Sequence, residues 1–216
     1  MSVEERVAHH FENDATRFDA IYRESGKNWF SRFVDNRWRG VVQRRLELAV
    51  TELAPLKGKS IFDVGCGSGR YCHAFAAGGA SRVLGIDFAP AMIDIANRLA
   101  AEQGLADRCE FRVGTFPADL GGERFDASTA MGYFDYVEHP EEHLRAMRAD
   151  TTGVMLMSFP KAWEWRVPVR RVRFALRRVP LFLYSERQVR DLLSRAGIED
   201  LRFIDLKRDY VVVARP

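Results

Sequence analysis

A glycine-rich turn after a short apolar run is the part of this sequence whose residue types and spacing best suit chemistry on a bound ligand. The turn reads Asp63-Val-Gly65-Cys66-Gly67-Ser-Gly69-Arg70. Glycines let the backbone approach a ligand closely, and such a turn delivers the ligand to the N-terminus of the following helix. A nicotinamide dinucleotide loop has the spacing GxGxxG, but here the third glycine comes one residue early. The loop therefore disfavours a nicotinamide oxidoreductase, which stays an alternative hypothesis.

Two aspartates flank this turn and indicate what the ligand carries. Asp63 lies two residues before the first glycine, where a carboxylate would repel a pyrophosphate but attract an ammonium group. Asp87 ends the next apolar run and is placed to accept hydrogen bonds from both ribose hydroxyls of a nucleoside. The two carboxylates predict a ligand with an amino acid at one end and a nucleoside at the other.

Short apolar runs that alternate with helical patterns must position these residues. The expected strands are 60–64, 82–86, 109–113, 125–130 and 153–159, and the helices between them are 71–77, 90–103 and 141–148. This alternation predicts an open, mostly parallel sheet covered on both faces. Two further runs, 201–206 and 210–214, are joined by three residues, which is too short for a parallel crossover. They predict an antiparallel hairpin.

The expected fold class is α/β, with a single doubly wound, mostly parallel seven-stranded sheet, a C-terminal antiparallel hairpin and an N-terminal helical arm. Residues 1–55 are expected to form the arm or lid, and residues 56–216 the main domain. The chain has 216 residues, 47% of them hydrophobic and 29% charged, which fits one globular domain. No apolar run reaches the roughly 18 residues of a membrane-spanning helix, and the first residues lack the apolar core of a secretion signal.

The turn, followed at the usual distance by Gly85-Ile-Asp87, resembles the class I S-adenosylmethionine-dependent methyltransferases. The resemblance covers roughly residues 56–159 and the terminal hairpin. It implies S-adenosylmethionine as the cofactor and S-adenosylhomocysteine as the product. The family usually places an acidic residue at the adenine after the third strand, and here Thr115 with Phe116 would replace it. The implied cofactor-binding residues are Asp63, Gly65, Cys66, Gly67, Gly69, Asp87, Phe88, Met92, Thr115, Phe116 and Met131.

Phe88 and Met92 are expected to sandwich the adenine, although plain packing at a helix start is the alternative. Met131, with Gly132 and Tyr133, would form the floor near the methionine end of the cofactor.

More narrowly, the chain is similar to magnesium-protoporphyrin and ubiquinone-type small-molecule O-methyltransferases. The similarity lies in an N-terminal arm that contains Phe18-Asp-Ala-Ile-Tyr22, a loop with His139-Pro140, and a substrate-covering insertion after the fifth strand. The resemblance implies catalytic roles for Tyr22 and His139, with core packing and helix capping as the respective alternatives. A metal at Asp135, Glu138 and His139 is conceivable, but none is expected. The other histidines, His9, His10, His73 and His143, are expected on solvated helical faces.

The basic charge of the chain is local. The formal net charge is +3, yet residues 161–180 carry seven Lys or Arg residues against one Glu. On a helical wheel these arginines lie opposite an apolar stripe, which is typical of a membrane-surface helix or of a cap over an acidic ligand. We therefore expect an insertion at about 161–184 that covers an acidic or amphiphilic acceptor or contacts an anionic membrane surface. A solvated arginine face is the alternative.

These features predict methyl transfer from S-adenosylmethionine to a small acceptor, with O-methylation favoured. N-methylation of a small molecule, and cofactor binding without turnover, are the alternatives. The rest of the chain is net acidic and shows no RNA- or DNA-binding module, so no nucleic-acid partner is expected. Three cysteines at irregular spacing suggest neither a disulfide framework nor a zinc site. The expected location is the cytoplasm, or the periphery of a membrane.

Overall fold

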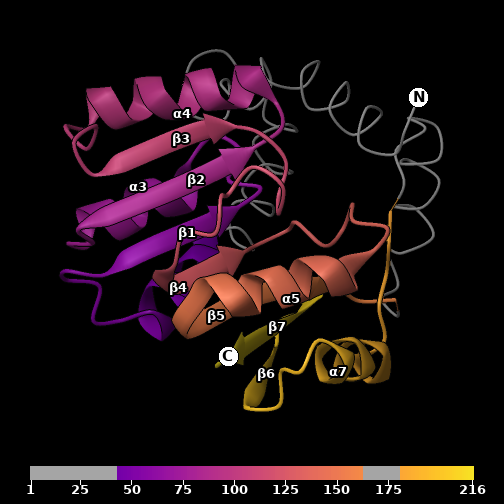
Figure 1. Cartoon of the computed structure of the whole chain (residues 1–216). Coiled ribbons are helices and arrows are strands. Elements are labelled where there is room, and N and C mark those ends of the chain that lie inside the picture. The colour runs from indigo at the N-terminus through magenta and orange to yellow at the C-terminus, as the bar shows by residue number, and fades with distance from the viewer. Residues whose placement is uncertain (1–42, 163–180) are drawn as a thin grey trace, which may run out of the picture.

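One seven-stranded sheet forms the centre of the computed structural model, which describes residues 43–162 and 181–216 (Figure 1). The strand order is β3-β2-β1-β4-β5-β7-β6. The strands are β1 (Ser60–Val64), β2 (Arg82–Asp87), β3 (Cys109–Val113), β4 (Phe125–Ala130), β5 (Thr151–Pro160), β6 (Leu201–Asp205) and β7 (Asp209–Ala214). The labelled helices are α3 (Arg70–Ala77), α4 (Pro90–Glu102), α5 (Pro140–Asp150) and α7 (Glu186–Arg195), and a helix over residues 43–52 precedes β1.

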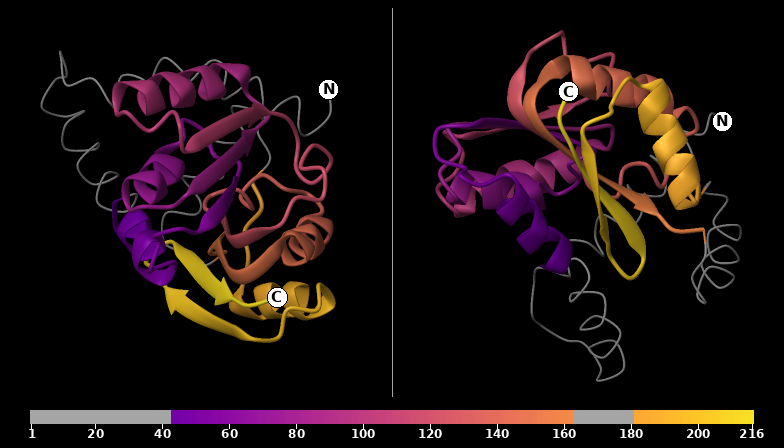
Figure 2. Two further views of the ribbon diagram at one scale, coloured as in Figure 1. Left: turned by 60° about the vertical axis from the view of Figure 1, so that its left-hand side comes forward. Right: turned by 90° about the horizontal axis from the view of Figure 1, so that it is seen from below.

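The sheet is parallel from β3 to β5 and antiparallel at its other edge. β1 pairs in parallel with both β2 and β4, whereas β7 runs antiparallel between β5 and β6. Figure 2 shows the β6–β7 hairpin at one edge of the sheet. The predicted α/β fold class and the predicted hairpin are both confirmed. Residues 1–42 of the expected arm and 163–180 of the expected insertion lie outside the described residues, so the domain boundaries stay a prediction.

Helix α7 begins at a capping-box sequence, in which Ser185 is followed three residues later by Gln188. The Ser185 side chain accepts a hydrogen bond from the Gln188 amide, and the Gln188 side chain accepts one from the Ser185 amide. This capping box satisfies two backbone donors that the first turn of a helix otherwise leaves without a partner. Gly197, at a φ of 76°, takes the left-handed conformation just after the helix end.

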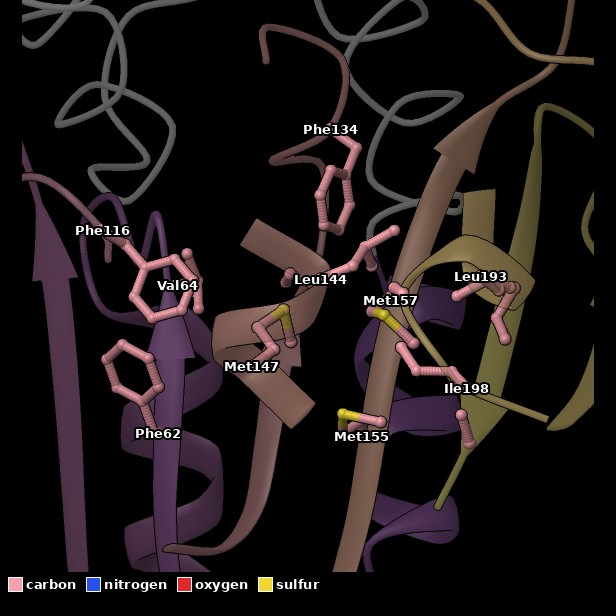
Figure 3. Packing of buried hydrophobic residues seen from close by; sticks show 14 of the residues in the cluster. Phe62, Val64, Phe116, Phe134, Leu144, Met147, Met155, Met157, Leu193 and Ile198 are labelled. Atoms are coloured by element: carbon pink, nitrogen blue, oxygen red, sulfur yellow. The ribbon is translucent and has the colours of Figure 1, made fainter. Parts of the chain in front are cut away.

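Two clusters of buried side chains cover the two faces of the sheet. Neighbouring residues on a strand point to opposite faces, so Ile61 packs with α3 and α4, while Phe62 packs with α5 and α7. Figure 3 shows part of the second cluster, where Leu144 and Met147 of α5 lie over the strands. The sheet is therefore covered on both faces, as a doubly wound fold requires.

The direction of winding reverses between β1 and β4. The chain moves outward from β1 through β2 to β3 and then returns to β4 on the other side of β1. Open α/β sheets bind ligands at this switch point, outside the carboxyl ends of the strands. The loops that follow β1 and β4 are therefore expected to border a ligand site. Among the described residues, no helix is both long and apolar enough to cross a membrane.

A largely buried ion pair joins the helix over residues 43–52 to β7. The Arg45 guanidinium donates from Nε to Asp209 Oδ2 at 3.0 Å, and the Asp209 side chain is 1% exposed. Burial lowers the pKa of Arg45, but Asp209, with smaller contributions from Asp135 and Tyr71, raises it by more. Oδ1 of Asp209 is buried and accepts no hydrogen bond from the described residues. This pair holds the helix over residues 43–52 against β7, beside Gly132 of the loop after β4.

We expect Asp209→Asn to lower the free energy of unfolding by about 3 kcal/mol, because it leaves the charge of Arg45 buried without its carboxylate. The matched control is Asp200→Asn, which breaks the exposed Arg215–Asp200 pair, with side chains 70% and 68% exposed. That change should cost less than about 1 kcal/mol. Urea denaturation measures both, and equal small effects would show that the buried pair does not stabilise the fold.

Candidate functional site

The three glycines of the loop between β1 and α3 serve different purposes. All have positive φ: 67° at Gly65, 52° at Gly67 and 76° at Gly69. A Cβ at Gly65 would lie 2.6 Å from the Tyr133 ring, and one at Gly69 would lie 2.8 Å from the Phe111 ring. A Cβ at Gly67 would meet nothing within 4 Å. Gly65 and Gly69 therefore allow close packing within the protein, while Gly67 exposes backbone to open space that a ligand can enter.

Asp87 fixes this loop in place. Its Oδ2 accepts a hydrogen bond from the Gly67 amide and its Oδ1 accepts one from the Ala89 amide, both at 2.9 Å. The side chain is 9% exposed, and burial raises its pKa although the two amides lower it. Each carboxylate oxygen has a second lone pair for a further donor. Asp87 thus anchors the loop and can also accept hydrogen bonds from a ligand that lies beside Gly67.

The amides of the loop are largely used within the protein. Those of Gly65 and Cys66 donate to the Ile86 carbonyl at 2.9 and 3.0 Å, and that of Gly69 donates to the Cys66 carbonyl at 3.0 Å. A phosphate needs donors, whereas an ammonium needs acceptors. The loop therefore has few amides left for a pyrophosphate, which weighs against a dinucleotide as the ligand.

Asp63 lies beneath the loop rather than on its surface. The side chain is 1% exposed, Thr129 of β4 donates to its Oδ1 at 2.6 Å, and the Cys72 thiol donates to its Oδ2 at 3.5 Å. Burial raises the pKa of Asp63 to about 7, although the Thr129 and Cys72 hydrogen bonds oppose the shift. From this position Asp63 would act on a ligand through its charge rather than by contact. Its predicted role toward an ammonium group stays a prediction.

Several other predicted cofactor residues are packed into the protein. Cys66, Phe116 and Met131 are at most 9% exposed and belong to the two core clusters. Phe88 is partly buried and packs with Met92, which is 2% exposed, at the start of α4. The structure thus places Phe88 and Met92 in one small apolar cluster beside Asp87, and their predicted contact with a base stays a prediction.

An acidic side chain that the sequence pattern did not reveal lies after β3. The amide and hydroxyl of Thr115 donate to Asp119 Oδ2 at 2.7 and 3.2 Å. This turn brings a carboxylate back to the end of β3, whose next residue, Gly114, donates its amide to the Asp87 carbonyl. The four-residue spacing from Thr115 to Asp119 was the one feature of the sequence that could have indicated this turn. Asp119 joins Thr115 as a candidate for the nucleoside end of the ligand.

The prediction for two histidines was wrong. His73 is 6% exposed and its Nε2 lies 3.0 Å from the Ala96 carbonyl oxygen. His143 is half-buried on α5, where its Nδ1 lies 2.9 Å from the Tyr133 hydroxyl. Burial lowers the pKa of His143, which favours the neutral imidazole. Both side chains turn inward because each finds a hydrogen-bond partner there. Helical spacing alone does not reveal which polar residues have such a partner.

Tyr133 and His143 form a pair at the switch point. The Tyr133 ring lies against Gly65, at the loop after β1, while its hydroxyl reaches His143 on α5. The predicted catalytic residue His139 is exposed, directly precedes α5 and makes no side-chain capping hydrogen bond. Tyr22 lies outside the described residues. The catalytic roles of His139 and Tyr22 therefore stay predictions, and Tyr133 with His143 is a candidate pair that sequence reasoning missed.

No metal centre is found in the part of the chain that the structure describes. Within it, no group of three or more His, Cys, Asp or Glu side chains is placed to hold an ion. Asp135 is buried, whereas Glu138 and His139 are exposed.

Comparison with known proteins extends this picture. Residues 61–150 match a family model described as a methyltransferase domain. The tRNA U34 carboxymethyltransferase of Marinobacter nauticus is 32% identical over 196 residues, which cover 86% of this chain and 57% of that protein. The protein of the same name from Alcanivorax borkumensis is 29% identical over 192 residues, with 85% and 58% coverage. The chain thus spans somewhat more than half the length of these relatives.

Among solved structures, magnesium protoporphyrin IX methyltransferase from Synechocystis PCC 6803 with bound S-adenosylhomocysteine gives a TM-score of 0.78 at 18% identity, and each chain is fully covered. At that identity the likeness shows the fold. Residues 61–150 thus match a methyltransferase domain, and the seven-stranded sheet to which they belong, with the glycine loop and Asp87 at its switch point, has the Rossmann-like methyltransferase fold.

Proposed function

We propose that the chain catalyses methyl transfer from S-adenosylmethionine to an acceptor bound over the carboxyl ends of β1 and β4. The observation that carries the proposal is the hydrogen bond between Asp87 and Gly67, beside the open space at Gly67. When bound, the cofactor supplies an electrophilic methyl group on a cationic sulfur. The protein then has to hold the cofactor and align the acceptor, and alignment alone contributes up to about 7–11 kcal/mol in well-oriented reactions.

The described residues fit this cofactor. Asp87 would accept the ribose hydroxyls, the loop carbonyls would accept the ammonium group, and Thr115 with Asp119 would lie toward the nucleobase. Asp63 beneath the loop would favour the cationic end of the cofactor by its charge. NAD carries a pyrophosphate, for which the loop has few amides left, so the same contacts disfavour the oxidoreductase alternative.

Tyr133 and His143 would serve the acceptor. A neutral imidazole at His143 can orient the Tyr133 hydroxyl and accept a proton through it. That role matters for an acceptor that must lose a proton, such as a phenol, and not for a carboxylate that is already ionised at pH 7. The predicted roles of His139 and Tyr22 belong to the same proposal.

Two acceptor classes have support. The arginines of residues 161–180 favour a small acidic or amphiphilic acceptor, with O-methylation preferred to N-methylation, or a docking contact with an anionic membrane. The similarity to tRNA U34 carboxymethyltransferases favours a tRNA acceptor instead. The expectation that no nucleic acid takes part therefore has no support from the comparisons. Cofactor binding without turnover is the remaining alternative.

Replacing Asp87 by Ala is expected to weaken S-adenosylhomocysteine binding by about 2–4 kcal/mol, because charge-assisted hydrogen bonds to two hydroxyls are lost. Isothermal calorimetry measures the affinity, and NAD should not compete. The matched control is Asp126→Ala, which removes a carboxylate bonded to Ser60 at the opposite end of the sheet. If the wild-type protein bound NAD as tightly as S-adenosylhomocysteine, the proposal would be wrong.

The affinity for S-adenosylmethionine is expected to rise with pH through about pH 7. Asp63, with its pKa raised to about 7 by burial, is mostly neutral at pH 6 and mostly ionised at pH 8. A bound cation favours the ionised carboxylate, so affinity should fall by up to about tenfold per pH unit below the pKa. Calorimetry from pH 5.5 to 8.5 measures this slope. In Asp63→Asn the affinity should no longer change with pH. If the affinity of the wild-type protein is equally independent of pH, Asp63 takes no part in cofactor binding.

Turnover is tested with S-adenosylmethionine that carries a tritiated methyl group. Cell extract is divided into a small-molecule fraction and a tRNA fraction, and each is incubated with the protein. We expect label in one fraction, and mass spectrometry of the labelled product identifies the acceptor. Label in neither fraction, with S-adenosylhomocysteine bound, would favour the alternative of binding without turnover.

The same assay ranks the candidate catalytic residues. Tyr133→Phe and His143→Gln should lower turnover about 10²-fold or more with an acceptor that must lose a proton, and leave S-adenosylhomocysteine affinity within about threefold. The matched control is Tyr210→Phe on the edge hairpin. Unchanged turnover in both variants would reduce the pair to a structural contact.

A further inference from the structure

A second basic feature lies at the other end of the sheet from the glycine loop. A pocket there is bounded by the start of β4, the last turns of α5 and the start of β5. Three guanidinium groups and no carboxylate side chain line it. Its lining residues are Arg124, Arg145, Arg148, Ala149, Thr151, Thr152 and Pro216.

Two of these arginines are less tightly paired than the third in the part of the chain that the structure describes. Neither Arg124 nor Arg148 makes a hydrogen bond or ion pair there, and both side chains are exposed. Arg145 is different, because it pairs with Glu141, which also accepts from Arg195. The carboxylate of Asp150 interacts electrostatically with Arg124. Among the side chains that line the pocket, positive charge therefore exceeds negative charge, and the neighbouring Glu141 and Asp150 offset part of it.

The hydroxyl groups of the pocket are already committed. Thr151 Oγ1 donates to the Met147 carbonyl and lies 2.7 Å from Ser128 Oγ, and Thr152 Oγ1 donates to the Phe125 carbonyl. A ligand would therefore be held by the guanidinium groups. A planar guanidinium group can donate two parallel hydrogen bonds to the oxygens of a phosphate, in a bidentate geometry. The pocket thus fits a phosphate or phosphodiester better than a neutral polar group.

A simpler role accounts for one arginine but not for both. Arg148 lies in the last turn of α5, where a cation offsets the negative end of the helix dipole. Arg124 precedes β4 and belongs to no helix, so the dipole does not explain why it faces the same pocket. The two groups come from segments separated along the chain and converge only in the folded protein.

We propose that this pocket binds backbone phosphates of an RNA whose reactive nucleotide occupies the site at the opposite end of the sheet. The inference rests on the proposed function in its tRNA form. Strands of five or six residues span about 17–20 Å, which is less than one turn of a duplex, about 34 Å. One structured RNA can therefore contact both ends of the sheet. Phosphate contacts position a nucleic acid and carry no sequence information themselves.

The test compares Arg124→Gln/Arg148→Gln with Lys57→Gln/Arg187→Gln, which removes two exposed charges outside the pocket. Fluorescence anisotropy measures the affinity of the full chain for unfractionated tRNA between 50 and about 300 mM salt. We expect the pocket variant to bind about tenfold more weakly at 150 mM salt and to lose about 1.5–2 from the slope of log K against log salt. The control variant should match the wild-type protein.

Two further measurements separate the outcomes. The affinity for S-adenosylhomocysteine should be the same in both variants as in the wild-type protein. If the wild-type protein does not bind S-adenosylhomocysteine at all, the proposed function fails. Inorganic phosphate, titrated by calorimetry, reports a site for a free ion. Phosphate binding that the pocket variant loses while tRNA binding stays unchanged would overturn the RNA assignment. Lack of tRNA binding by the wild-type protein, or equal effects in the two variants, would show that Arg124 and Arg148 are ordinary surface charges.

Discussion

The arrangement of the site depends on one carboxylate. Asp87, the last residue of β2, accepts the Gly67 amide on one oxygen and the Ala89 amide on the other, so it fixes the turn after β1 to the start of α4. With these bonds made, Gly67 faces open space, and the other two glycines are held against aromatic rings. Burial favours the neutral form of such a group, and the two amides offset part of that penalty. Ligand hydroxyl groups that donate hydrogen bonds to Asp87 would offset more of the cost of burying its charge.

The sheet order brings the rest of the site to this point. Because β1 and β4 are parallel neighbours at the switch point, their loops meet, and the Tyr133 ring lies on Gly65. α5 covers the adjoining face and presents His143 to the Tyr133 hydroxyl. On the far side, Arg45 ties the helix before β1 to β7 and passes Gly132. Three separate segments thus converge on the space above the strand ends, where an acceptor would be aligned.

Local signals allowed much of the fold to be predicted. The glycine loop, the capping box at Ser185 and the three-residue hairpin turn each report a structure formed within a few residues, and each is found. Contacts between distant residues could not be predicted in this way. The Arg45–Asp209 pair joins residues 164 positions apart, and the Asp63–Thr129 bond joins strands whose register no single segment encodes. The burial of His143 and the return of Asp119 to Thr115 likewise depend on packing that periodicity does not describe.

The measurement that tests this account most directly is a crystal structure of the chain with S-adenosylhomocysteine. The account predicts the ribose hydroxyls on the Asp87 carboxylate, the ligand backbone alongside Gly67, and the sulfur on the side of Tyr133, with the Asp87–Gly67 hydrogen bond retained. A ligand bound elsewhere on the sheet, or at the switch point with its ribose away from Asp87, would contradict it.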